Sequence, residues 1–257
     1  MAHIRVERIT VSFPVYSASA RSLKRGMIGL ATGGRIGLDG DRTVQITALD
    51  DVDLTFEHGD RVGLIGHNGA GKSTLLKVLA GVYEPVRGRV RCEGRVASMS
   101  NPRLGIDQDS TGYENIFQRG LFMGLRPREI EARTDEIAAF TELGDYLAMP
   151  VRTYSAGMAA RLAFAISTCV EADILLMDEW LSAGDAAFVA RARERMSDLV
   201  DKAGILVLAS HSDNLIRETC NKALLLERGK VVGFGPIDDI LAIYHGRRQA
   251  AQPAAVS

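Results

Sequence analysis

Residues 66–73 carry the strongest chemical signal in this chain of 257 residues, because they read Gly-His-Asn-Gly-Ala-Gly-Lys-Ser and match the pattern G-x-x-x-x-G-K-S/T. Glycines let backbone N–H groups turn inward around phosphates, and a helix that starts at the loop adds its positive end. Lys72 would reach the terminal phosphates, Ser73 could ligate magnesium, and Thr74 supplies a further hydroxyl. A purely structural turn needs neither the lysine nor the hydroxyl, so we expect a nucleotide site. Its expected ATP-binding residues are Gly66, His67, Asn68, Gly69, Ala70, Gly71, Lys72, Ser73 and Thr74.

Two adjacent carboxylates follow later in the chain. Residues 174–179 read Ile-Leu-Leu-Met-Asp-Glu, a short apolar run typical of a buried strand that ends in Asp178 and Glu179. Charge at the end of a buried strand is costly without a cation, which indicates magnesium as the partner. We expect Asp178 to hold Mg²⁺ together with Ser73, and Glu179 to be the catalytic base that accepts a proton from the attacking water. His211 follows the next apolar run, where it could hydrogen-bond the terminal phosphate.

The elements that must position these residues alternate between strands and helices. Apolar residues spaced by two or three near residues 4–13 and 52–56 predict an antiparallel sheet. Apolar runs and helix-forming stretches then predict strands at 61–65, 174–177 and 205–209, helices at 73–79 and 186–202, a hairpin near 227–230, and a last helix ending about residue 244. This pattern predicts an α/β fold.

The region from about residue 105 to 170 interrupts this pattern and is mainly helical. Thr111 and Glu114 form a capping box, and Pro127 suits the first position of another helix that ends near Gly144. Ser155 suits the cap of the helix that follows. We expect a single domain over residues 1–245, with a helical subdomain of about 100–165 inserted in the core lobe and a disordered tail at 246–257.

Composition limits the classes of partner. The chain has 31 basic and 32 acidic residues, a net charge of −1, which excludes the broad positive field of a dedicated nucleic-acid binder. Three cysteines without close or metal-type spacing indicate free thiols in a reducing compartment. We find neither a signal peptide nor an apolar run long enough to span a bilayer, so a membrane role would require a partner protein.

Residues 154–158, Tyr-Ser-Ala-Gly-Met, identify a family in combination with the motifs above. The chain resembles ABC transporter ATPases over about residues 2–245. The resemblance implies a P-loop NTPase fold of ABC type, with a mixed sheet, an antiparallel β part and an inserted helical subdomain. It also implies that two protomers close head to tail around two ATP molecules and Mg²⁺. In that dimer Ser155, Ala156, Gly157 and Met158 act in trans as the signature motif, Asp185 belongs to the D-loop, and His211 is the switch histidine.

The variant YSAGM and the segment TGYENIFQRGLFMGL are similar to ATPases that export lipid-linked polysaccharides, including O-antigen and teichoic acid exporters. Within that subgroup the opening FPVYSASARSLK most resembles the ATPase of an actinobacterial cell-wall galactan exporter. This resemblance implies a homodimer that works with two copies of an integral membrane permease at the cytoplasmic face of the cell membrane, where the permease handles the lipid-linked glycan and no nucleic acid is involved. The rival hypothesis is a soluble ABC-type regulatory or translation ATPase that is not coupled to transport.

Three positions stay open at this stage. The Q-loop position falls on Asn101, with Gln108 as the alternative. The aromatic residue that stacks on adenine is Tyr16 or Phe13, and core burial of Phe13 is the competing interpretation. The basic segment 17–46 is expected to be a loop or short surface helix, which is either a solvated insertion or a contact with anionic lipid or a membrane partner.

Overall fold

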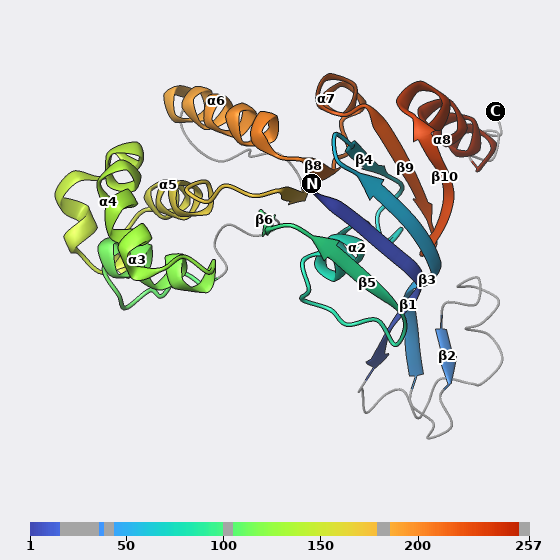
Figure 1. The fold of residues 1–257 in the computed structure, drawn as a ribbon, viewed down its shortest axis with the longest axis horizontal. Helices are drawn as coiled ribbons and strands as arrows, with labels where there is room; N and C mark the ends of the chain where they lie inside the picture. Colours follow the sequence, from blue (N-terminus) through green and yellow to red (C-terminus); the bar gives the residue numbers. More distant parts are fainter. Residues whose placement is uncertain (16–35, 39–43, 100–104, 179–185, 252–257) are drawn as a thin grey trace, which may run out of the picture. The chain divides into compact units, whose positions relative to one another are not determined.

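The computed structural model describes residues 1–15, 36–38, 44–99, 105–178 and 186–251 (Figure 1). These residues form two compact units. The first contains the described parts of 1–94, 176–179 and 205–257, and the second contains those of 95–175 and 180–204.

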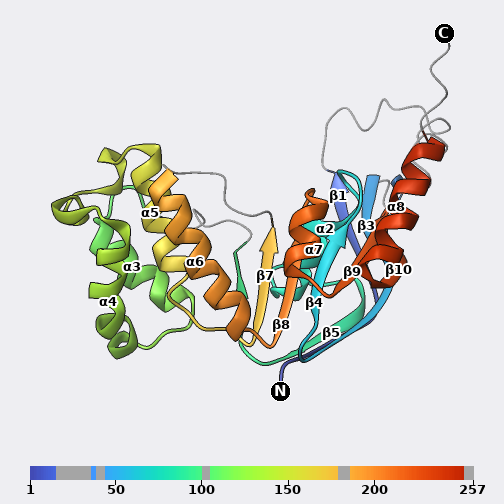
Figure 2. The same cartoon turned by 90° about the horizontal axis from the view of Figure 1, so that it is seen from above.

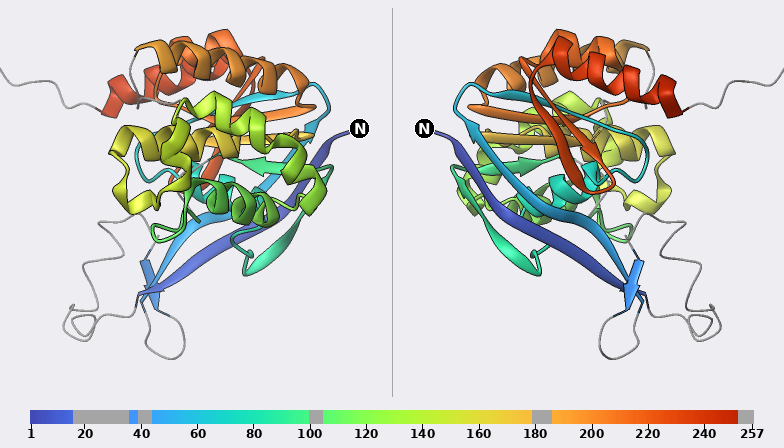
Figure 3. Two further views of the ribbon diagram at one scale, coloured as in Figure 1. Left: turned by 90° about the vertical axis from the view of Figure 1, so that its left-hand side faces the viewer. Right: turned by 90° about the vertical axis from the view of Figure 1, so that its right-hand side faces the viewer.

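The first unit begins with an antiparallel sheet of strand order β2-β3-β1-β5. Its strands are β1 (His3–Val15), β2 (Ile36–Leu38), β3 (Val44–Glu57) and β5 (Arg87–Glu93). Figure 3 shows β1 and β3 as long paired strands, with Ile4 opposite Phe56 and Val6 opposite Leu54. These four side chains are buried, because alternate residues of a strand share one face of the sheet.

The second sheet is mixed, as the sequence predicts. In the first unit its order is β10-β9-β4-β8-β7, with β4 parallel to β8 and β9 and β9 antiparallel to β10. These strands are β4 (Arg61–Ile65), β7 (Ile174–Asp178), β8 (Ile205–Ala209), β9 (Lys222–Glu227) and β10 (Lys230–Pro236). Strands β4, β7 and β8 are buried runs of Val, Ile, Leu, Met and Ala, as expected where helices cover a parallel sheet. The expected site residues follow or end these strands.

In the part of the first unit that the structure describes, the helices are α2 (Lys72–Leu79), α7 (Asp213–Thr219) and α8 (Ile237–Ala251). Helix α8 lies along β9, β10 and β4, with α7 beside it (Figure 2). Among the described residues no helix is long and apolar enough to cross a membrane.

The second unit is mainly helical. It contains β6 (Val96–Ser98), α3 (Gly112–Phe122), α4 (Pro127–Thr141), the 3₁₀ turns η2 (Gly144–Ala148) and η3 (Val151–Thr153), α5 (Ala156–Ser167) and α6 (Ala186–Lys202). The predicted capping box is confirmed, since Glu114 N donates to Thr111 Oγ1 and Thr111 N donates to Glu114 Oε2. Pro127 is the first residue of α4, also as predicted.

Helix α6 groups with this helical unit, which therefore extends beyond the expected range of about 100–165. The ring of Phe188 on α6 packs against Phe140 of α4 and Phe164 of α5, with centroids 5.8 Å apart in each pair. Arg191 on α6 pairs with Glu142 at 2.5 Å, and Arg195 pairs with Glu136 at 2.9 Å. These long-range contacts leave no periodic signal in the sequence.

Two local expectations were wrong. The segment 17–46 contains strand residues, because Ile36–Leu38 form β2 and pair with β3 from Val44 onward. The last helix does not end about Tyr244 but continues to Ala251, so residues 246–251 of the expected disordered tail are helical. Residues 252–257 lie outside the described part of the chain.

Candidate functional site

The loop between β4 and α2 folds around the side chain of Lys72. Its Nζ donates to the carbonyl oxygens of Gly66 at 2.6 Å and His67 at 3.3 Å. The Lys72 side chain is buried, whereas His67, Asn68, Gly69 and Ser73 are exposed. The ammonium is thereby held inside the loop, while the tip of the loop is exposed to solvent.

Glycine is required at two positions of this loop. Gly66 has φ 149°, and a Cβ there would lie 2.3 Å from the Leu226 carbonyl oxygen. Gly71 has φ 115° and precedes the first turn of α2, where a Cβ would lie 2.9 Å from the Ala48 carbonyl oxygen. A backbone carbonyl cannot shift aside as the end of a flexible side chain can. Packing therefore requires glycine at these two positions, in addition to the requirement for close approach of a ligand.

A hairpin from the far end of the chain supports the loop. Gly229 N donates to the Ala70 carbonyl at 2.8 Å, and Asp50 N donates to the Gly229 carbonyl at 2.9 Å. Gly229 has φ 81°, the left-handed conformation expected for a hairpin turn between β9 and β10. The loop therefore depends on residues that follow it by more than 150 positions in the sequence.

The sheet brings three of the predicted residues to neighbouring strands. Gly66 follows β4, Asp178 ends β7, and His211 lies two residues after β8. Since β8 lies between β4 and β7, these positions are adjacent in the strand order. Asp178 is half-buried, and His211 and Ser73 are exposed.

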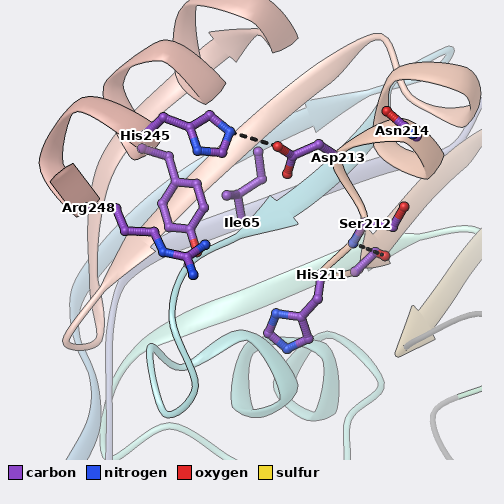
Figure 4. A pocket seen from close by; sticks show the side chains of 10 residues that line it. Ile65, His211, Ser212, Asp213, Asn214, His245 and Arg248 are labelled. Atoms are coloured by element: carbon purple, nitrogen blue, oxygen red, sulfur yellow. Dashed lines mark hydrogen bonds and ion pairs between the residues drawn. The ribbon is translucent and has the colours of Figure 1, made fainter.

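Helix α8 completes this region with residues that the sequence analysis did not predict. A pocket of about 480 Å³ is lined by Ile65, Gly66, residues 210–214, Tyr244, His245 and Arg248. A second pocket, of about 440 Å³, is lined by His67, Asn68, His211, Glu227, Tyr244, Arg247 and Arg248. Figure 4 shows Arg248 extending from α8 on the same side of the pocket as His245. In the sequence this part of the site is marked only by Tyr-His-Gly-Arg-Arg at 244–248, of which residues 246–248 belong to the expected tail.

The predicted signature residues lie in the second unit. Ser155 caps α5, as expected, and its Oγ accepts a hydrogen bond from Met158 N at 3.2 Å. Ser155, Ala156 and Gly157 are exposed. A Cβ added at Gly157 would have Ser155 Oγ, 3.9 Å away, as its nearest neighbour. This helix start therefore presents an open backbone surface.

Several predicted positions lie outside the described residues, namely Tyr16, Asn101, Glu179 and Asp185. Gln108, the alternative residue for the Q-loop position, is exposed in the second unit. Its carbonyl oxygen accepts a hydrogen bond from Arg152 N at 2.8 Å. Phe13 is half-buried and not a core residue, with its ring edge-on to Tyr83 at 5.1 Å between centroids.

Comparison with known proteins gives consistent results. Residues 49–182 match the family model described as ABC transporter. The chain is 43% identical to the O-antigen export system ATP-binding protein RfbE of Yersinia enterocolitica, over 90% of this chain and 97% of that protein. It is 41% identical to the O-antigen export system ATP-binding protein RfbB of Myxococcus xanthus, over 77% of this chain and 46% of that protein.

The fold is also similar to a solved structure of a dimeric ATP-binding cassette in a post-hydrolysis state, bound to ADP and Pi. The TM-score is 0.66 over 91% of this chain and 98% of that one, at 18% identity. At this identity the similarity concerns the fold alone.

Proposed function

The chain belongs to the ABC transporter family and is an ATPase of that family, and we propose that it powers the export of a lipid-linked polysaccharide across the cytoplasmic membrane. The observation that carries the proposal is the similarity to an O-antigen export ATP-binding protein over 97% of that protein's length. Because the alignment includes the helical unit as well as the phosphate loop, the similarity reaches beyond the parts that all nucleotide-hydrolysing proteins of this kind share.

The phosphate loop of residues 66–74 would hold ATP through its backbone N–H groups, with Lys72 at the terminal phosphates and Thr74 as a further hydroxyl donor. Lys72 Nζ donates to the carbonyl oxygens of Gly66 and His67. Since both carbonyls belong to the loop itself, the ammonium is already near the place where it is needed.

The donor set of the first unit fits a magnesium ion. The hydroxyl of Ser73 and the carboxylate of Asp178 are hard oxygen ligands, the type that Mg²⁺ prefers alongside phosphate oxygens. When bound, the ion would neutralise charge that develops on the phosphates. We assign Ser73 and Asp178 as the protein ligands.

Catalysis itself would use Glu179 as the base for the attacking water and His211 as the residue that contacts the terminal phosphate. Glu179→Gln should lower turnover about a hundredfold to ten-thousandfold while ATP-bound dimers persist. Rapid hydrolysis by that variant, measured as phosphate release, would refute the assignment of the base.

A homodimer would complete each nucleotide site. Ser155, Ala156, Gly157 and Met158 of one protomer would face the nucleotide of the other, with Asp185 in the D-loop between them. Exposure of Ser155, Ala156 and Gly157 at the start of α5 supports this arrangement, because another chain could approach these residues.

A membrane permease, in two copies, would bind the helical unit. On α3 the side chains of Tyr113, Phe117 and Leu121 recur every fourth residue and are 45%, 38% and 45% exposed, and Phe122 beside them is 84% exposed. Such an apolar stripe on a helix surface is typical of a protein interface. The permease would place the chain at the cytoplasmic face of the membrane and would handle the glycan.

The finer identity of the cargo is also a proposal. We infer a galactan from the opening segment of the sequence, within the broader class of lipid-linked polysaccharides. No comparison favours the rival hypothesis of a soluble regulatory or translation ATPase, since the relatives described above are named as ATP-binding proteins of O-antigen export systems.

Co-purification with the permease tests the proposed assembly. Phe117→Ser combined with Phe122→Ser should abolish recovery of the permease from detergent extracts, because the substitutions remove the apolar stripe, while ATP binding stays unchanged. The matched control is Val82→Ser with Val86→Ser, two residues of the first unit that are 64% and 63% exposed. Equal loss of permease in both variants, or in neither, would contradict this docking surface.

A further inference from the structure

We propose that His245 of α8 is a positioning residue for ATP hydrolysis, which holds the loop of His211 in place through Asp213. This inference rests on the role proposed above for His211 and extends the site to the last helix of the chain. The juxtaposition joins residues 32 positions apart in the sequence.

The contact between the two side chains is short. Nε2 of His245 lies 2.7 Å from Oδ2 of Asp213, and both side chains are partly buried, with 44% and 36% exposed. Because a carboxylate can only accept a hydrogen bond, His245 must carry a proton on Nε2. Figure 4 shows the two groups facing each other, with His211 on the opposite side of Ser212.

Hydrogen bonds within the turn shape the loop that carries His211. His211 and Ser212 are exposed; Ser212 N donates to Ser210 Oγ at 3.0 Å, and Leu215 N donates to Ser212 Oγ at 3.3 Å. Asp213, two residues after His211, connects this turn to α8 through its contact with His245.

Helix α8 is itself anchored, so it can serve as a fixed support. Its residues Ile240 and Leu241 are buried, 4% and 1% exposed. Near its end Arg247 donates to Glu227, the last residue of β9, at 2.9 Å. The helix therefore connects the core of the sheet with the loop of His211.

A second ion pair between α7 and α8 provides a control. Arg217 near the end of α7 donates to Asp238 in the first turn of α8. This pair fastens the same two helices without touching the loop of His211. If the His245–Asp213 contact only stabilised helix packing, the loss of either pair would have similar consequences.

Steady-state ATP hydrolysis by the full chain with Mg²⁺ tests the proposal, with the melting temperature measured for each variant. His245→Ala and Asp213→Ala should each lower kcat roughly tenfold to a hundredfold, with KM for ATP within about twofold of wild type, because small misplacements of reacting groups reduce rate more than binding. The double variant should be no slower than either single variant, since both remove one interaction. His245→Gln, which keeps an amide donor near the Nε2 position, should restore most of the rate, and Asp238→Asn should match wild type.

His211→Ala separates this inference from the function on which it rests. If His211→Ala hydrolyses ATP as fast as wild type, the proposed role of His211 fails. If it is slow while folded His245→Ala and Asp213→Ala keep wild-type kcat, His245 has no positioning role and the role of His211 stands. If Asp238→Asn loses as much kcat as His245→Ala, the contact contributes only to helix packing, which would also overturn the inference.

Discussion

The ammonium group of Lys72 donates a hydrogen bond to the carbonyl oxygen of Gly66, 2.6 Å away in the same loop. The pairing gives a buried cation hydrogen-bond acceptors, which is necessary because a buried charge without a partner is strongly unfavourable. It also joins the lysine side chain to the backbone of its own loop.

Replacement of this lysine should abolish the site. Lys72→Ala removes the charge that meets the terminal phosphates, so ATP hydrolysis should fall by at least about a hundredfold. Phosphate release measures ATP hydrolysis, and equilibrium titration with a fluorescent ATP analogue measures nucleotide binding. The control is Lys230→Ala, which removes a surface lysine that pairs with Asp50 at 3.1 Å. Hydrolysis by Lys72→Ala at the rate of this control would exclude residues 66–74 as the catalytic nucleotide site.

Gly229 should be more sensitive to substitution than another turn glycine of similar conformation. Gly229→Ala places a methyl group 2.6 Å from the Ala48 carbonyl oxygen, whereas Gly59, with φ 94°, has no atom within 4 Å of that position. Left-handed backbone alone costs roughly 1–2 kcal/mol for an alanine, so denaturant unfolding should show that cost for Gly59→Ala and a larger one for Gly229→Ala. We expect weaker ATP binding only in Gly229→Ala, because Gly229 N supports Ala70. Equal unfolding free energies for the two variants would contradict this account.

The capping box of α3 should make stability depend on pH. Hydrogen bonds from the Thr111 N–H and hydroxyl lower the pKa of Glu114 below its ordinary value of 4.5. The contribution of the Glu114 carboxylate to stability is therefore fully present above pH 4.5 and is lost as the pH falls through the lower pKa of the folded protein. Glu114→Gln should have a lower Tm than wild type at neutral pH, and the difference should close on acidification. A difference in Tm that stayed constant with pH would show that the charge is not responsible.

Cys220 should be unreactive in the folded protein. Burial raises its pKa to about 12, and only the thiolate reacts with alkylating reagents. At pH 8 about one molecule in ten thousand would carry the thiolate at this position. Mass spectrometry after a brief iodoacetamide pulse should find Cys220 unmodified in native protein and alkylated after denaturation in urea. Fast labelling of the native protein would mean that β9 and α7 open readily at this position.

Local sequence signals predicted most of the fold. Hydrophobic runs identified β4, β7 and β8, and the capping residues Thr111 and Ser155 identified the starts of α3 and α5. Each of these signals depends on neighbours in the chain. The two caps are stabilised by those same neighbours, whereas the strands also require pairing with distant segments, as between β4 and β8.

The missed features depend on contacts between distant segments. Strand β2 forms because it pairs with β3, and α6 joins the helical unit through Phe188 and Arg191. The role of α8 was missed because its basic end resembles a solvated tail, and only the structure brings His245 to Asp213. Composition cannot distinguish an exposed basic helix from one that supports a loop.

Cargo accumulation in the source cells tests the proposed export most directly. Cells depleted of the chain and complemented with wild type or Lys72→Ala would be extracted, and their lipid-linked glycans measured by mass spectrometry. We predict that Lys72→Ala leaves a polymer, expected to be a galactan, accumulated on its lipid carrier, and that wild type clears it. An unchanged glycan pool in depleted cells, with the loss of the chain verified, would contradict polysaccharide export and return the chain to an undefined transport role within its family.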